Sequence, residues 1–179
     1  MLMHSNIVLV GPMGSGKSAV GKHLARDLDL DFVDSDAEIE KRTGVDISYI
    51  FEKEGEAGFR VREREMIAEL AKRQAIVLAT GGGAVLEADN RRVLSECGTV
   101  VYLQTTIDQQ LERTRHTRHR PLLLDRDPEA VLTKLMEIRA PLYEEVADVT
   151  VKTGGRRVGA VVSEIRKALE DESRTPLKS

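Results

Sequence analysis

The sequence contains very little cysteine, no tryptophan and no long apolar run. Cys97 is the only cysteine among 179 residues, so no disulfide can form within the chain. No apolar run approaches the roughly 18 residues that a membrane-spanning helix needs. The N-terminus also lacks a basic segment followed by an apolar stretch and a cleavage site, which is the pattern of an export signal. We therefore expect a cytoplasmic protein that does not enter a membrane.

The charge of the chain has no strong bias of either sign. Its 27 Lys and Arg residues nearly balance its 30 Asp and Glu residues, and the net charge is -3. Strongly basic proteins are the ones that bind nucleic acid or anionic membranes through overall charge, so we expect neither partner. With 41% hydrophobic and 32% charged residues, the composition is typical of a soluble globular protein. The length favours one domain over residues 1–179, with a polar tail at 171–179 that frays.

Short apolar segments alternate with longer amphipathic ones, which predicts a parallel sheet with helices on both faces. The expected strands are Asn6–Val10, Asp31–Asp34, Ala75–Ala79, Val100–Leu103 and Val149–Lys152. Capping patterns predict three helix starts: Ser35 and Thr106 each precede a Glu or Gln by three residues, and Asp127 precedes a proline. Gly98 is typical of a residue that ends a helix in the left-handed conformation.

Residues 11–18 read Gly-Pro-Met-Gly-Ser-Gly-Lys-Ser, which fits the phosphate-binding pattern G-x-x-x-x-G-K-[ST]. The pattern lies between a predicted strand and a predicted helix, which is the context in which it binds phosphate. The glycines allow a tight turn whose backbone N–H groups meet an anion, and the helix N-terminus adds its dipole. Lys17 can reach the β- and γ-phosphates, and the Ser18 hydroxyl can ligate Mg²⁺. The sequence therefore predicts a site for a nucleoside triphosphate.

Two further clusters follow predicted strands. Asp34 and Asp36 come at the end of the second strand, and Thr-Gly-Gly-Gly at 80–83 follows the third. Ligands of α/β sheets bind at these carboxyl ends. The carboxylates could serve Mg²⁺ and an acceptor hydroxyl, or Asp36 could only stabilise the N-terminus of a helix. The glycines would let a ligand come close to the backbone.

Three arginines complete the candidate site. Arg60 could bind a carboxylate or phosphate through two hydrogen bonds, although a helical arginine is more often a surface charge. Arg139 lies near the end of a predicted helix, where a cation is favourable even without a ligand. Arg120 belongs to a polar stretch at 115–126, which is either a lid that closes over phosphates or a solvated loop. Its position and composition favour the lid.

In this order the motifs resemble the shikimate kinase family over nearly the whole chain. They are the P-loop, D-S-D at 34–36, E-x-x-F-R at 56–60, T-G-G-G at 80–83, R-P-L-L at 120–123 and R-x-P-L-Y at 139–143. The resemblance implies an α/β, three-layer P-loop NTPase fold like that of nucleoside monophosphate kinases, with a lid and a five-stranded parallel sheet in the order 2-3-1-4-5. It also implies transfer of the γ-phosphate of ATP to the 3-hydroxyl of shikimate, on the pathway to chorismate and aromatic amino acids.

Residue by residue, the resemblance implies an ATP site made of Gly14, Ser15, Gly16, Lys17, Ser18, Ala19, Arg113, Arg120 and Arg156. It implies shikimate binding by Asp36, Arg60, Gly82, Gly83 and Arg139, and Mg²⁺ binding by Ser18 and Asp34. Lys17, Asp36 and Arg120 are implied to be catalytic, with Asp36 as the general base. Ala19 stands where many members have threonine, and Arg156 lies in a loop that varies within the family.

Two other functions stay open. Another small-molecule kinase of the same fold, such as one for gluconate, would share the P-loop and lid. The combination of Arg60 and Arg139 with a glycine triplet is not expected in such a kinase.

The other alternative is a regulatory module that binds nucleotide without catalysis. Such a module could lack Asp36, so the presence of Asp36 argues against it. A monomer that acts on small molecules is the family expectation.

Overall fold

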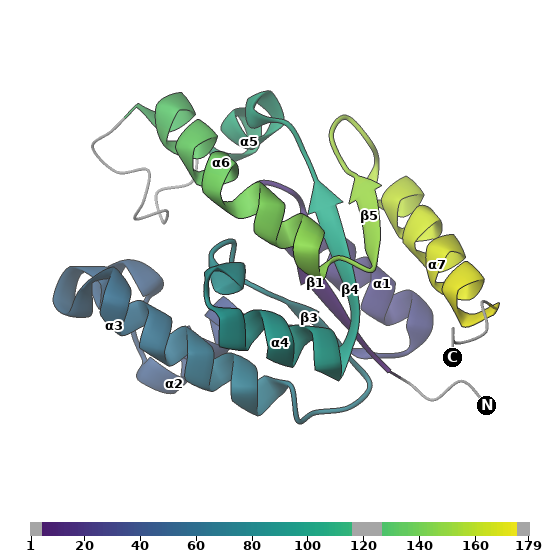
Figure 1. The fold of residues 1–179 in the computed structure, drawn as a ribbon, viewed down its shortest axis with the longest axis horizontal. Helices are drawn as coiled ribbons and strands as arrows, with labels where there is room; N and C mark the ends of the chain where they lie inside the picture. The colour runs from purple at the N-terminus through teal and green to yellow at the C-terminus, as the bar shows by residue number, and fades with distance from the viewer. Residues whose placement is uncertain (1–4, 116–126, 175–179) are drawn as a thin grey trace.

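The computed structural model describes residues 5–115 and 127–174. Its parallel sheet has the strand order β2-β3-β1-β4-β5, as the family resemblance implied (Figure 1). The strands are β1 (Asn6–Val10), β2 (Asp31–Asp34), β3 (Ile76–Ala79), β4 (Gly98–Gln104) and β5 (Val149–Lys152). The helices are α1 (Lys17–Leu28), α2 (Ser35–Thr43), α3 (Ile47–Leu70), the 3-10 turn η1 (Ala84–Leu86), α4 (Ala88–Cys97), α5 (Ile107–Thr114), α6 (Pro128–Val146) and α7 (Val158–Arg174).

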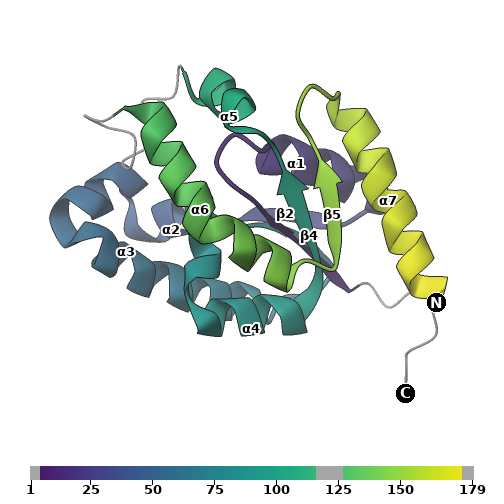
Figure 2. The same ribbon diagram turned by 45° about the horizontal axis from the view of Figure 1, so that its top comes forward.

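Helices cover both faces of the sheet and give three layers (Figure 1 and Figure 2). Strand β1 shows how one strand serves both faces, because its side chains alternate. Ile7 and Leu9 pack with α1 and α7, whereas Val8 and Val10 pack with α3, α4 and α6. A strand buried on both sides is apolar throughout, which explains the uninterrupted apolar run ahead of the P-loop.

Two of the three predicted helix starts are confirmed. Thr106 and Asp127 each cap their helix, since each side chain accepts a backbone N–H of the first turn. The prediction for Ser35 was wrong by one residue. Asp34 is the cap of α2, and its carboxylate accepts two N–H groups of that helix, while Ser35 is buried as the first helical residue. A carboxylate that precedes the helix reaches these donors better than a hydroxyl already inside it.

The ends of two strands also differ from the prediction. Gly98 has an extended backbone with φ of 179° and begins β4 instead of ending α4 in the left-handed conformation. A Cβ on Gly98 would overlap the carbonyl oxygen of Asn6, so the glycine allows β4 and β1 to approach closely. Ala75 has φ of 57°, outside the range of a strand, and β3 therefore begins one residue later than predicted.

Two predicted segments lie largely outside the described residues. The predicted lid at 115–126 does so apart from Arg115, and Arg120 lies outside with it. Helix α7 continues to Arg174, so the first four residues of the predicted frayed tail are helical, in a stretch (160–174) without glycine or proline. In the described ranges, no helix is both long enough and apolar enough to cross a membrane.

Candidate active site

The loop between β1 and α1 forms a cradle for an anion. Gly14 and Gly16 have φ of 77° and 91°, in the left-handed region where a side chain is unfavourable. Gly16 directly precedes α1, and no side chain caps this helix, so a phosphate can accept its first N–H groups. The Lys17 ammonium donates hydrogen bonds to the carbonyl oxygens of Gly11 at 2.6 Å and Pro12 at 2.9 Å. The predicted phosphate-binding lysine is thus held against the loop that it would serve.

A pocket of about 370 Å³ adjoins this loop and includes Ser18, Ala19 and Asp34 in its lining. The Ser18 hydroxyl donates to Asp34 Oδ2 at 3.3 Å, while the other Asp34 oxygen caps α2. A hydroxyl and a carboxylate beside a phosphate site suit Mg²⁺, which usually shares its remaining coordination with phosphate and water. Among residues 5–115 and 127–174, no group of three or more His, Cys, Asp or Glu side chains could hold a metal ion.

A second pocket, of about 170 Å³, adjoins the first, and the two share Met13, Asp36, Gly81 and Gly82 in their walls. The Asp36 carboxylate lies close to the backbone of Gly81, because a Cβ on Gly81 would stand 2.9 Å from Asp36 Oδ1. Only glycine fits there without moving the carboxylate. A molecule in the second pocket can therefore contact Asp36 while it reaches toward the phosphate pocket.

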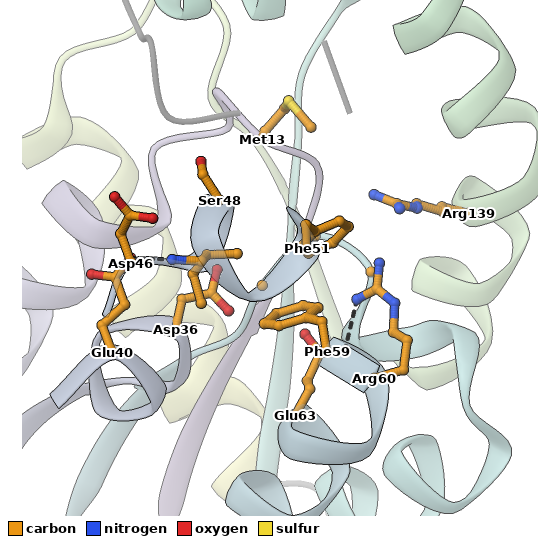
Figure 3. A pocket seen from close by; sticks show the side chains of 14 residues that line it. Met13, Asp36, Glu40, Asp46, Ser48, Phe51, Phe59, Arg60, Glu63 and Arg139 are labelled. Atoms are coloured by element: carbon orange, nitrogen blue, oxygen red, sulfur yellow. Dashed lines mark hydrogen bonds and ion pairs between the residues drawn. The ribbon is translucent and has the colours of Figure 1, made fainter. Parts of the chain in front are cut away.

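Arg60 and Arg139 line the second pocket from α3 and α6, on the side away from the carboxylates of Asp36, Glu40 and Asp46 (Figure 3). The Arg60 side chain is 12% exposed and Arg139 is 4% exposed. Burial lowers the pKa of both guanidinium groups. Nearby carboxylates outweigh burial at Arg60 and leave its pKa above the ordinary value, whereas the pKa of Arg139 stays below it. Two neighbouring guanidinium groups in a small pocket suit a carboxylate that accepts hydrogen bonds from both.

Glu63 is a site residue that the sequence motifs did not identify. It is completely buried, and its Oε1 accepts a hydrogen bond from Arg60 Nη1 at 2.8 Å (dashed in Figure 3). Burial raises the pKa of Glu63, although Arg60 and Arg139 oppose that shift. Residues three apart on a helix lie side by side, so this spacing could have indicated the pair. Glu63 holds one end of the Arg60 guanidinium in place.

The glycine turn after β3 brings the backbone against both guanidinium groups. A Cβ on Gly83 would overlap the guanidinium of Arg60, and one on Gly82 would stand 3.4 Å from Arg139 Nη1. A side chain at Gly83 would push Arg60 aside, whereas a Cβ at Gly82 would only touch Arg139. Both glycines therefore lie where the sequence placed them, next to the residues predicted to bind the same carboxylate.

A further space of about 200 Å³ lies beside the P-loop and includes Ala19, Arg113 and Arg156 in its lining. Arg113 Nη1 donates to the carbonyl oxygen of Gly14 at 2.9 Å, which ties α5 to the P-loop. Arg156 forms an ion pair with Glu164 of α7. Guanidinium groups stack on flat rings, so this space suits a nucleotide base.

Comparison with known proteins decides the family. The family model described as shikimate kinase matches residues 13–170. The shikimate kinase of Shewanella frigidimarina is 57% identical over 164 residues, which cover 92% of this chain and 96% of that protein. The chain belongs to the shikimate kinase family. Among solved structures, a shikimate kinase from Acinetobacter baumannii in complex with shikimate is 48% identical, with a TM-score of 0.93 over 96% of both chains.

Membership of the shikimate kinase family confirms the resemblance that the ordered motifs predicted. A gluconokinase from Sinorhizobium meliloti is similar to this chain in fold, with 23% identity and a TM-score of 0.63. The structure brings the predicted acceptor residues to one pocket and the P-loop with Asp34 to the adjoining one. Arg120 is the one predicted site residue that falls outside the described residues.

Proposed function

We propose that this protein transfers the γ-phosphoryl group of ATP to the 3-hydroxyl of shikimate, giving shikimate 3-phosphate and ADP. Membership of the shikimate kinase family supports the reaction. The observation that carries the proposal is the shared wall of the two pockets, where Asp36 adjoins both. A small polyhydroxy acid held through its carboxylate by Arg60 and Arg139 would present its hydroxyl groups to the phosphate pocket.

Shikimate matches the second pocket in its charge and in the distribution of its polar groups. Its carboxylate can accept hydrogen bonds from both arginines and from backbone N–H groups of Gly82 and Gly83. At the other end of the ring, Asp36 can accept a hydrogen bond from the reactive hydroxyl. Asp36 would take that proton as the hydroxyl oxygen attacks the γ-phosphorus, and the electrons of the broken P–O bond leave with ADP. Fixing both ends of a rigid ring is the kind of orientation that lowers a barrier by several kcal/mol.

The P-loop residues Gly14 to Ala19 would bind the phosphates of ATP. Lys17, which in the structure contacts loop carbonyl oxygens, would turn to the γ-phosphate and offset the charge that develops there. Arg113 and Arg156 would flank the adenine in the third space. Arg120, in the proposed lid at 115–126, would reach the transferred phosphate.

Ser18 and Asp34 are the residues that would hold Mg²⁺, Ser18 directly and Asp34 through water. Their oxygens already lie 3.3 Å apart, and the cap of α2 fixes the orientation of the Asp34 carboxylate. Bound with ATP, Mg²⁺ would neutralise phosphate charge.

We also propose that the enzyme is a cytoplasmic monomer of one domain that acts on small molecules, without nucleic acid or membrane partners. The described residues assigned to ATP and to the acceptor come together within one chain. The net charge of -3 provides no general attraction for nucleic acids or anionic lipids.

The deciding experiment measures ADP release by the purified protein with ATP and Mg²⁺, with shikimate, quinate, gluconate or no acceptor. We expect strong stimulation by shikimate alone. Stimulation by gluconate instead would leave the P-loop chemistry in place and refute the acceptor. ATP binding without stimulation by any acceptor would support the regulatory module.

A further inference from the structure

Tyr143 links helix α6 to the glycine turn of the acceptor pocket, although it does not line that pocket itself. It lies on α6 one turn after Arg139 and is 0% exposed. Its hydroxyl donates a hydrogen bond to the carbonyl oxygen of Gly82 at 2.5 Å. Its ring stacks on that of Tyr102 from β4, with centroids 5.1 Å apart. The stacked ring leaves the hydroxyl little freedom, so the position of the Gly82 carbonyl is set by α6 and the sheet.

The hydrogen bond to Gly82 also determines the direction of the next amide. The Gly82 carbonyl and the Gly83 N–H belong to one peptide unit, and no peptide bond in the described structure is cis. In a planar trans unit the N–H points opposite to the C=O. Because Tyr143 draws the carbonyl oxygen toward α6, the Gly83 N–H points away from Tyr143. Gly83 lines the acceptor pocket beside Arg60, and its N–H makes no backbone hydrogen bond within the described residues.

Arg139 lies one turn before Tyr143 on the same helix. Burial lowers the pKa of Arg139, and a Cβ on Gly82 would stand 3.4 Å from its Nη1. Burial raises the pKa of Tyr143 itself, so the phenol keeps its proton and remains a donor to Gly82. One helix therefore bears both the Arg139 guanidinium and the hydroxyl that holds the peptide unit next to it.

We propose that Tyr143 is a positioning residue for the acceptor carboxylate: it fixes the Gly82–Gly83 peptide relative to Arg139, so that the amide and guanidinium donors converge on one carboxylate. This inference rests on the proposed function, because it assumes that an acid binds in this pocket. It adds a residue that acts on the acceptor only through two others. The binding of ATP does not depend on it.

The test compares Tyr143→Phe with Tyr102→Phe. Both variants lose one hydroxyl from the same pair of stacked rings, but the Tyr102 hydroxyl makes no hydrogen bond to a described residue. For Tyr143→Phe we expect the KM for shikimate to rise about five- to tenfold, as for the loss of one net hydrogen bond, with the KM for ATP unchanged. Tyr102→Phe should leave both KM values as in the wild type. Thermal melts of both variants report any loss of stability.

The methyl ester of shikimate separates positioning from a merely structural role, because it keeps the ring hydroxyls and lacks the negative charge. Tyr143→Phe should lower kcat/KM for shikimate and leave kcat/KM for the ester nearly unchanged. An equal loss with both acceptors, or a KM for shikimate like that of Tyr102→Phe, would overturn the inference while leaving the proposed function intact. If the wild-type protein does not phosphorylate shikimate at all, both the proposed function and this inference are refuted.

Discussion

Replacing Arg60 by alanine should weaken shikimate binding far more than ATP binding. Arg60 lines the acceptor pocket and is absent from the lining of the phosphate pocket. A hydrogen bond to a charged group contributes about 1.5–3 kcal/mol. We therefore expect the KM for shikimate to rise about 10- to 150-fold, with little change in the KM for ATP.

The same substitution should also destabilise the fold, because it leaves Glu63 without its main partner. The Glu63 side chain is 1% exposed and its Oε1 lies 2.8 Å from Arg60 Nη1. Removing one member of a buried ion pair costs about 3–5 kcal/mol, and the nearby charge of Arg139 reduces that loss. The double variant Arg60→Ala, Glu63→Gln lacks the uncompensated charge. It should recover most of the stability and none of the shikimate affinity.

Arg62→Ala is the matched control. Arg62 lies on the same helix, is 41% exposed at its side chain and pairs with Glu54 at 2.6 Å. Exposed ion pairs of this kind contribute about 0–1 kcal/mol, so this variant should behave like the wild type. The assay is steady-state ADP release with each substrate varied in turn, beside thermal melts. Equal losses of affinity for shikimate and ATP in the stable double variant would refute the role given to Arg60.

Three further results are expected. Lys17→Ala should lower kcat by about 10²- to 10³-fold, as for other groups that offset transition-state charge, with an unchanged melting temperature; near-normal turnover would remove Lys17 from the mechanism. Gly81→Ala should lower kcat, because its Cβ would stand 2.9 Å from Asp36 Oδ1; a normal kcat in a folded variant would show that this position tolerates the displacement. Burial raises the pKa of Glu63 above its ordinary 4.5, so the folded protein holds the Glu63 proton more tightly than the unfolded chain does. The stability contributed by this proton is present below pH 4.5 and is lost as the pH rises through the raised pKa. Thermal melts should show the wild type losing stability relative to Glu63→Gln as the pH rises from 4.5 toward neutrality, and a difference independent of pH would contradict the burial argument.

Local patterns predicted the fold well, because they depend on neighbours in the sequence. Strands β1, β2 and β5 have the bounds that the sequence predicted, and the caps at Thr106 and Asp127 use donors within the next three residues. Gly98 was misinterpreted since its role is set by Asn6, on a strand far away in the sequence. A glycine after a helix serves equally well as a helix end or as a site of close strand approach, and only the packed sheet distinguishes them.

The candidate site was predictable to the extent that its residues form motifs. The family resemblance indicated Asp36 and both arginines, and the structure brings them to one pocket. Glu63 and Tyr143 act through other residues, by a hydrogen bond to Arg60 and one to the Gly82 carbonyl. The spacing of Arg60 and Glu63 on α3 could have indicated the first of these contacts. The second depends on how α6 packs against the turn after β3, and a linear pattern contains little of that information.

Gly55 shows how a residue with no close neighbour can restrict the divergence of a protein. It lies at the kink of α3 with φ of 72° and ψ of 178°, a combination that is essentially limited to glycine. A Cβ there would meet nothing within 4 Å, so space would permit a Cβ and the backbone geometry is what disfavours it. The kink sets the course of the second half of α3, which bears Arg60. A library of variants at position 55 should thus retain glycine under selection for growth without aromatic amino acids, although Gly55 lines none of the three spaces of the site.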